Sequence, residues 1–224
     1  MYKLPISCQV VWQPAGAWRP LATGECHLWQ LDLTRFPAQS AVLDAEEQIR
    51  WLSMTQPQAA QRFCATRTAL RQLLGHYLCC NPADVAIRLG AQGKPELATT
   101  SQSLFFNLSH TADVALLAFC SVGPIGVDVE RSRNLSGIRR VAERVFNADE
   151  VRCLREAGDD PQVFLRLWVR YEARQKCLGL GLLQKTLAPV TLDFFAGTWG
   201  DGWQLGLAWF SQPVKPELHF FQLH

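Results

Sequence analysis

The chain lacks a hydrophobic segment long enough to cross a bilayer. The longest uninterrupted apolar run, Val114 to Cys120, has seven residues, whereas a membrane-spanning helix needs about 20. A signal-peptide core is also missing, because Pro5, Ser7 and Gln9 interrupt the apolar residues at the N-terminus. We therefore expect a cytoplasmic protein that makes no contact with a membrane.

The chain also lacks a strong net charge and cysteine patterns that bind metals. Its 22 Lys and Arg residues nearly balance 20 Asp and Glu residues, and the formal net charge of +2 is small for a nucleic-acid-binding protein. The eight cysteines include no CxxC pair and no histidine at zinc-finger spacing. We expect no nucleic-acid partner, and we expect the cysteines to be reduced thiols.

What the chain does contain is enough apolar sequence for a substantial core, since 48% of its 224 residues are hydrophobic. Two blocks of helix and strand meet near residues 100–112 and predict an α+β chain of two similar halves, 1–108 and 109–224. The pattern predicts helices over 38–52, 57–80, from 147 and over 160–179, and strands over 25–33, 85–89, 104–108, 114–120, 125–130, 190–195, 203–210 and 218–223.

Three carboxylates form the first candidate site. Asp128 and Glu130 alternate on a predicted strand, so they share a face with Cα atoms roughly 6.6 Å apart. Two acids at this spacing are often only a solvated pair on an exposed strand face. Glu172 lies one helical turn from Lys176, and such a pair is by default an ordinary ion pair on the surface. Trp168 lies one turn earlier on the same helix face, which is unusual for a face that only meets solvent. Because all three candidate ligands are carboxylates, Mg²⁺ is favoured over zinc.

Several cationic side chains suggest a ligand that carries phosphates. Arg62, Arg67 and Arg71 lie off the apolar side of a predicted helix, where arginines by default only face water. Lys94 stands in a predicted turn, and His110 follows Ser109 at a strand end, where it could equally bond the local backbone. Taken together, these groups match a ligand with several phosphates.

The motifs in this order resemble the 4'-phosphopantetheinyl transferases, specifically the longer single-chain type that activates carrier domains of peptide and polyketide synthases in secondary metabolite biosynthesis. The chain departs from that family's usual pattern at Tyr171, where lysine is usual, and at Arg174 and Gln175, where apolar residues are usual. The matching segments are Gly93 to Pro95, Asn107 to Thr111, Gly126 to Glu130, Arg144 to Glu150 and Trp168 to Gly181.

The resemblance implies an intramolecular pseudodimer with coenzyme A in the cleft between its halves. It implies transfer of the 4'-phosphopantetheine arm to a serine of an apo carrier protein, with release of 3',5'-adenosine bisphosphate. Mg²⁺ or Mn²⁺ would be held by Asp128, Glu130 and Glu172. Glu172 would also act as the base, and Lys176 would stabilise the diphosphate. The nucleotide end would be held by Arg62, Arg67, Arg71, Lys94, Ser109 and His110.

The expected partner is an acidic acyl or peptidyl carrier protein that docks transiently on the basic and apolar stretch 131–146 of a monomer. Two alternatives stay open at this point. A non-catalytic binder of coenzyme A or of a carrier protein is suggested by Tyr171 at the usual lysine position. A metal-dependent phosphodiesterase or nuclease is disfavoured, because Glu172 and Lys176 are four residues apart and the net charge is low.

Overall fold

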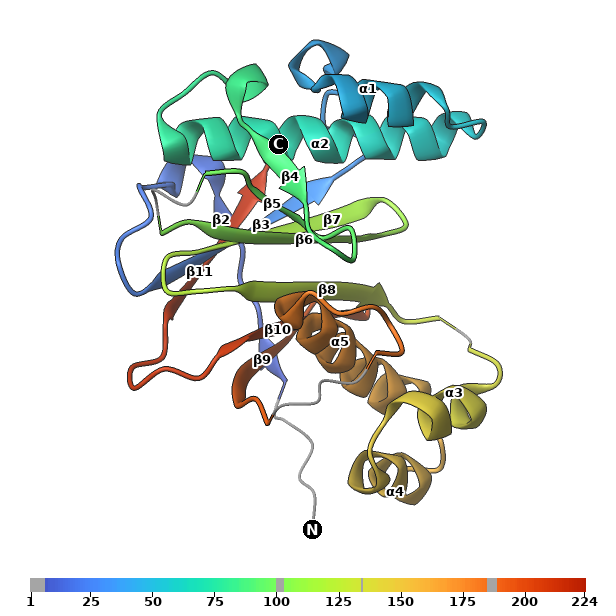
Figure 1. The fold of residues 1–224 in the computed structure, drawn as a ribbon. Helices are drawn as coiled ribbons and strands as arrows, with labels where there is room; N and C mark the ends of the chain where they lie inside the picture. The colour runs from blue at the N-terminus through green and yellow to red at the C-terminus, as the bar shows by residue number, and fades with distance from the viewer. Residues whose placement is uncertain (1–6, 100–102, 134, 185–188) are drawn as a thin grey trace.

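The computed structural model describes residues 7–99, 103–133, 135–184 and 189–224, which form two main sheets (Figure 1). The five-stranded sheet has the order β2 (Gln13–Pro14), β11 (Glu217–Leu223), β3 (Glu25–Asp32), β7 (Val114–Cys120) and β6 (Phe105–Thr111). The four-stranded sheet has the order β1 (Cys8–Gln9), β9 (Leu192–Trp199), β10 (Trp203–Phe210) and β8 (Ile125–Arg131). β4 (Ile87–Leu89) and β5 (Pro95–Leu97) pair separately.

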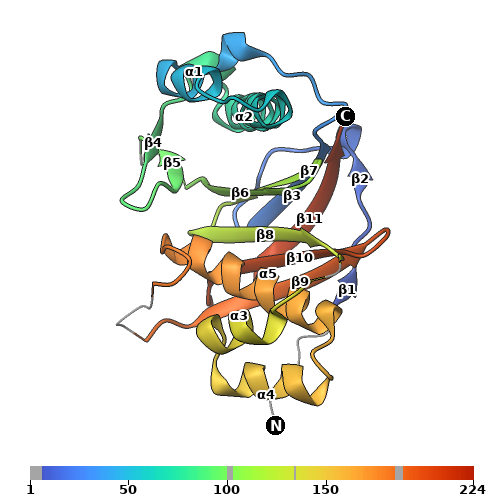
Figure 2. The ribbon, with the colours of Figure 1, turned by 90° about the vertical axis from the view of Figure 1, so that its right-hand side faces the viewer.

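Each main sheet carries one long helix, and this confirms the predicted α+β chain of two halves. Figure 2 shows α2 (Pro57–Leu78) with α1 (Ala45–Leu52) above the five-stranded sheet, and α5 (Pro161–Leu178) against the four-stranded one. α3 (Ile138–Val145) and α4 (Ala148–Glu156) pack on α5. Short 3-10 turns lie at Ala15–Ala17, Ser40–Val42 and Pro82–Asp84.

Capping side chains explain where the predicted helices begin and end. Asn147 accepts from the backbone of Glu150 at 2.9 Å, and the Glu150 side chain accepts in return at 3.1 Å, which forms a capping box. Asp160 caps α5 by accepting from the backbone nitrogen of Gln162 at 2.7 Å, and Gly179 ends the helix with φ of 66°. The helix predicted from residue 38 begins later, at Ala45, because Asp44 is its cap.

Two of the hydrophobic clusters in the described residues pack against the five-stranded sheet, one on each of its faces. One lies between α2 and the five-stranded sheet and includes Leu70, Leu74 and Phe119. The other lies between the two sheets and includes Leu116 and Val127. The side chain of Asn107 joins the sheets directly, because its Oδ1 accepts from the buried backbone nitrogen of Val127 at 2.9 Å. β6 and β8 therefore run side by side, and this junction positions the candidate site.

The two halves exchange strands at their ends. The C-terminal β11 pairs in parallel with β3, and the N-terminal β1 pairs in parallel with β9. The predicted boundary between residues 108 and 109 falls inside β6, all of whose register partners lie in β7. Strand pairing favours a boundary in the 121–124 turn instead, because β8 belongs to the other sheet.

Cysteine pairing differs from the expectation of reduced thiols throughout. Cys26 and Cys120 are direct register partners on β3 and β7, and their sulfur atoms are joined in a disulfide. Their separation of 94 residues hides this proximity in the sequence. None of the helices in the described ranges combines the length and the apolar character that a bilayer span requires.

Candidate active site

Two glycines allow α5 to lie unusually close to the four-stranded sheet. A Cβ atom added at Gly126 would overlap the backbone of Ala173 and Cys177, and one added at Gly206 would overlap the carbonyl of Val169. Gly206 is also the register partner of Asp128. The absent side chains thus bring the helix that carries Glu172 and Lys176 directly onto the strand that carries Asp128 and Glu130.

Lys176 and Asp128 form the centre of this contact. Lys176 Nζ donates to Asp128 Oδ1 at 2.7 Å and to Ser109 Oγ at 2.8 Å. Ser109 Oγ in turn donates to Asp128 Oδ1 at 2.8 Å. The other carboxylate oxygen, Asp128 Oδ2, is buried and has no hydrogen-bond partner among the described residues. A buried carboxylate oxygen without a donor is a natural ligand for a cation.

Glu130 and Glu172 add negative charge around Asp128. Burial, followed by the charges of Asp128 and Glu130, raises the pKa of Glu172 to about 7, although Lys176 opposes the shift. Burial and the Asp128 charge likewise raise the pKa of Glu130. These three acids, with no Cys or His among them, fit the ligand preference of Mg²⁺. A divalent cation would offset their mutual repulsion, so the residues present are compatible with this metal.

A pocket of about 280 Å³ opens beside this cluster. The 90–95 turn, α2, β6 and the end of α5 contribute to its walls, which include the predicted residues Arg67, Lys94, His110 and Lys176. Arg50 and Phe63 also line it and were not predicted. The guanidinium of Arg50 lies 5.2 Å from the Phe63 ring centroid. Arg50 lies on another helix, and no sequence spacing links α1 to the pocket.

The predicted cationic residues differ in what they contact. Arg67 Nη1 is buried without a hydrogen-bond partner in the described ranges, so it can serve a ligand. Lys94 Nζ donates to the carbonyls of Ile125 and Cys177, both at 3.3 Å, and braces the turn against β8 and α5. Arg62 pairs with Asp113 at 2.6 Å and stands outside the pocket lining. Burial and the positive charges of Lys176 and Arg62 lower the pKa of His110.

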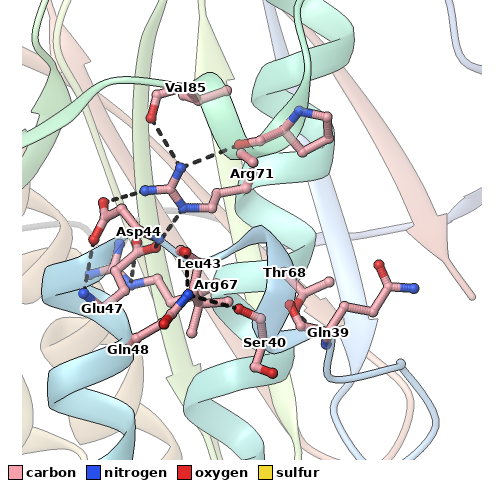
Figure 3. A network of polar contacts seen from close by, with 12 residues as sticks. Gln39, Ser40, Leu43, Asp44, Glu47, Gln48, Arg67, Thr68, Arg71 and Val85 are labelled. Atoms are coloured by element: carbon pink, nitrogen blue, oxygen red, sulfur yellow. Dashed lines mark hydrogen bonds and ion pairs between the residues drawn. The ribbon is translucent and has the colours of Figure 1, made fainter.

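Arg71 has a different role from the predicted one, as Figure 3 shows. It is fully buried, and its guanidinium donates to Glu47 at 2.5 Å, to Asp44 and to the carbonyl of Val85 at 3.0 Å. With these donors engaged inside the protein, Arg71 cannot contact coenzyme A. The prediction for Arg71 is therefore corrected: it joins α2 to α1 and to the segment before β4.

Two of the residues that depart from the family's usual pattern, Tyr171 and Gln175, hold the segment after α5. Tyr171 Oη donates to the carbonyl of Leu182. Gln175, which is 2% exposed, donates to the carbonyls of Gly181 and Gln184, both at 2.8 Å. Tyr171 thus fixes this segment through a neutral hydroxyl group, at a position where the family usually has the charged side chain of lysine. Spacing alone could not reveal these contacts, because the accepting groups are backbone carbonyls.

Comparison with known proteins agrees with this geometry. Residues 124–222 match the model of the 4'-phosphopantetheinyl transferase superfamily, and residues 27–122 match that of the 4'-phosphopantetheinyl transferase N-terminal domain. The chain is 34% identical over 182 residues to the 4'-phosphopantetheinyl transferase HetI of Nostoc sp., which covers 78% of this chain and 77% of the relative.

Two further relatives match shorter stretches. A putative 4'-phosphopantetheinyl transferase of Synechocystis sp. is 34% identical over 154 residues, or 67% of this chain and 63% of the relative. The 4'-phosphopantetheinyl transferase AcpT of Escherichia coli is 37% identical over 111 residues, or 49% of this chain and 55% of the relative. The two matched ranges together contain every candidate site residue discussed above.

Proposed function

The chain belongs to the 4'-phosphopantetheinyl transferase family, and from this premise we propose how its residues transfer the phosphopantetheine arm of coenzyme A to a carrier protein. The observation that carries the proposal is the contact of Lys176 with Asp128 at 2.7 Å, beside a carboxylate oxygen that has no donor among the described residues. Lys176, which makes this contact, also lines the pocket of about 280 Å³ together with the cationic side chains of Arg50, Arg67 and Lys94.

Asp128, Glu130 and Glu172 would hold Mg²⁺ or Mn²⁺, and the metal when bound would offset the charge of the diphosphate. In support, burial and then the charges of the neighbouring carboxylates raise the pKa of both glutamates. Lys176 is bonded to Asp128 and Ser109, from which its ammonium group can turn toward the diphosphate oxygens. Ser109 holds Asp128 and Lys176 in place in this account and does not itself bind the nucleotide.

Glu172 is our candidate for the base. In the transfer, the serine oxygen of the carrier forms a new bond to the phosphorus of the pantetheine arm, and the bond from that phosphorus to the departing 3',5'-adenosine bisphosphate breaks. The serine proton passes to the Glu172 carboxylate. In the metal-free protein the Glu172 pKa of about 7 leaves about half of the group ionised near neutral pH, and a bound cation would favour the carboxylate form that accepts the proton.

The nucleotide end would occupy the pocket beside Arg50, Arg67, Lys94 and His110. Arg67 is the strongest candidate for a phosphate contact, because its buried Nη1 makes no bond within the described residues. Charge-assisted bonds of this kind are short and stronger than neutral ones. Arg62 would act indirectly, by fixing the β6–β7 turn through Asp113.

The carrier protein would dock on α3 and the residues that precede it, in the stretch 131–146, of which residue 134 lies outside the described ranges. Arg140 and Arg144 form no ion pair with the described residues, and Val141 is 37% exposed. A basic surface with an apolar centre suits an acidic carrier. We propose a cytoplasmic monomer, since both halves of the site belong to one chain.

The test is the intact mass of an apo carrier protein incubated with the enzyme, coenzyme A and Mg²⁺. Transfer adds one phosphopantetheine arm, and excess EDTA should abolish the addition. A non-catalytic binder would leave the carrier mass unchanged and coenzyme A intact. A phosphodiesterase would consume coenzyme A and leave the carrier mass unchanged. Unaltered transfer in EDTA would rule out the metal part of the proposal.

A further inference from the structure

The sequence Glu-x-His occurs twice in strands that lie side by side. It occurs as Glu25 to His27 in β3 and as Glu217 to His219 in β11. The two strands pair in parallel, with Glu217 opposite Glu25 and His219 opposite His27. Because alternate residues share one face of a sheet, the two acids and two histidines form a square of four metal-ligand side chains. It lies near Tyr77, at the end of α2 away from the coenzyme A pocket.

The distances among Glu25, Glu217 and His219 suit a single small cation, and His27 adjoins this group through Glu25. His219 Nε2 lies 3.7 Å from Glu25 Oε1 and 3.4 Å from Glu217 Oε1. His27 Nε2 lies 3.4 Å from Glu25 Oε2. Ligand atoms of Glu25, Glu217 and His219 all lie within 4.8 Å of one another. Nitrogen and oxygen ligands at about 2.1 Å from a tetrahedral zinc ion are separated by about 3.4 Å.

The second observation is the unused nitrogen of His27. The His27 side chain is 0% exposed, and its Nε2 has no hydrogen-bond partner among the described residues although it faces Glu25. The opposite nitrogen, Nδ1, lies 2.8 Å from Tyr77 Oη, which also accepts from Trp29 Nε1 at 2.9 Å. Metal-binding histidines are typically oriented by such a contact at the other ring nitrogen.

Arg19 indicates where positive charge is favoured in this cluster. Its Nη2 lies 2.6 Å from Glu25 Oε1 and 3.1 Å from His219 Nε2, between two groups that would ligate a metal. The Arg19 side chain is 48% exposed, so it can turn into solvent without unfolding the chain. Glu217 is also exposed, which gives an ion a path from solvent.

We propose that Glu25, His27, Glu217 and His219 form a zinc-binding site, separate from the active-site carboxylates, in which the ion takes the position of the Arg19 guanidinium. Two imidazoles with carboxylates are a ligand set that zinc prefers and that Mg²⁺ does not. The ion would join the C-terminal β11 to β3, and would therefore stabilise the folded chain rather than take part in transfer.

The test titrates the metal-free protein with Zn²⁺, and separately with Co²⁺ as a spectroscopic probe, in millimolar Mg²⁺ to occupy the active-site acids. The exposed Cys8, Cys79 and Cys80 are first replaced by serine, because thiolates also bind zinc. We expect one Zn²⁺ per chain, a higher thermal midpoint with Zn²⁺, and visible Co²⁺ absorption typical of tetrahedral coordination. Absence of saturable binding in this background would overturn the proposal.

Matched variants locate the ion. His219→Gln and Glu217→Gln should each weaken Zn²⁺ binding by about tenfold or more and remove the thermal shift, whereas Arg19→Ala should bind Zn²⁺ more tightly because the competing guanidinium is gone. Glu217 is largely exposed, so its variant tests the site even where a histidine variant folds poorly. Equal Zn²⁺ affinity in Glu217→Gln, His219→Gln and the parent protein would contradict the assignment.

Discussion

At the residue scale, two arginines of α2 have different roles: Arg67 lines the pocket, whereas Arg71 holds the fold together. Arg67 lines the pocket with a buried nitrogen that has no partner in the described chain, whereas Arg71 is fully buried among Asp44, Glu47 and the Val85 carbonyl. Both follow the same helical pattern in the sequence. The difference comes from α1 and its cap. Glu47 and Asp44 accept hydrogen bonds from Arg71, and Nη1 of Arg67 stays available for a ligand.

We expect Arg71→Met to destabilise the protein by about 3–5 kcal/mol, because it leaves the Glu47 and Asp44 carboxylates without their buried cation. Arg67→Met should cost less stability but weaken coenzyme A binding more. Urea denaturation and equilibrium binding of coenzyme A measure the two effects. The distinction fails if Arg71→Met folds as stably as the parent and loses coenzyme A affinity to the same degree as Arg67→Met.

His110 should make the recognition of the 3'-phosphate depend on pH. Burial and the charges of Lys176 and Arg62 lower its pKa in the free protein, so it is neutral near pH 7. A bound phosphate favours the charged imidazole and raises that pKa, so binding takes up a proton. The His110 contribution to affinity is therefore expected to grow as the pH falls from about 8 towards 6.

The measurement compares the affinities of coenzyme A and 3'-dephospho-coenzyme A across this pH range in the parent and in His110→Gln. The 3'-phosphate itself gains a proton near pH 6, but it does so equally for both proteins. The parent should prefer coenzyme A increasingly at lower pH relative to the variant. Parallel profiles for the two proteins would remove His110 from the phosphate contact.

At the element scale, the placement of α5 on the sheet creates the site. Gly126 and Gly206 lie under the helix where any side chain would overlap its backbone. Lys176 on the helix and Asp128 on the strand, which are 48 positions apart in sequence, therefore meet at hydrogen-bond distance. Sequence spacing predicted which residues of the helix and of the strand belong to the site. The close packing of the helix on the sheet depends instead on two glycines, which have no side chain.

Gly126→Ala should displace α5 and lower stability by about 1–3 kcal/mol or more, which is the usual cost of overpacking a core. Activity should fall further than stability alone explains, because Glu172 and Lys176 move with the helix. Gly16→Ala is the matched control, since nothing lies within 4 Å of an added Cβ there. Thermal unfolding measures the loss of stability, and the transfer rate measures the loss of activity. A Gly126→Ala protein as active as the parent would show that the site does not require the close packing of α5 on the sheet.

Local signals explain why some elements were predictable and others were not. Asn147 and Asp160 mark helix starts because their side chains accept backbone hydrogen bonds, and both starts were predicted correctly. α3 was not predicted, because Gly137 precedes it and its N-terminus has no side-chain cap. The short β5 was not predicted, and its first residue, Pro95, was assigned to the 90–95 turn, since Gly93 and Pro95 indicate chain reversal more strongly than pairing.

At the scale of the whole molecule, the missing information is long-range pairing. The sequence motifs predicted two halves, the candidate metal-binding carboxylates and the candidate phosphate-binding cations, whereas the exchange of β1 and β11 between sheets has no local signature. The same is true of the Cys26–Cys120 disulfide and of the Glu-x-His pair, whose partners are brought together only by strand register. Contacts between distant strands follow from topology, which single-residue patterns do not encode.

The central claim is that Asp128 serves the metal alone, whereas Glu172 serves the metal and takes the serine proton. The most direct test measures the transfer rate onto an apo carrier, by intact mass, against Mg²⁺ concentration for Asp128→Asn and Glu172→Gln, with the exposed Glu156→Gln as control. Added Mg²⁺ should recover part of the Asp128→Asn activity. Glu172→Gln should stay roughly 10²- to 10⁴-fold slow at saturating Mg²⁺ while still binding coenzyme A. Equal rescue of both variants by Mg²⁺ would contradict the account, because Glu172 would then be a ligand only.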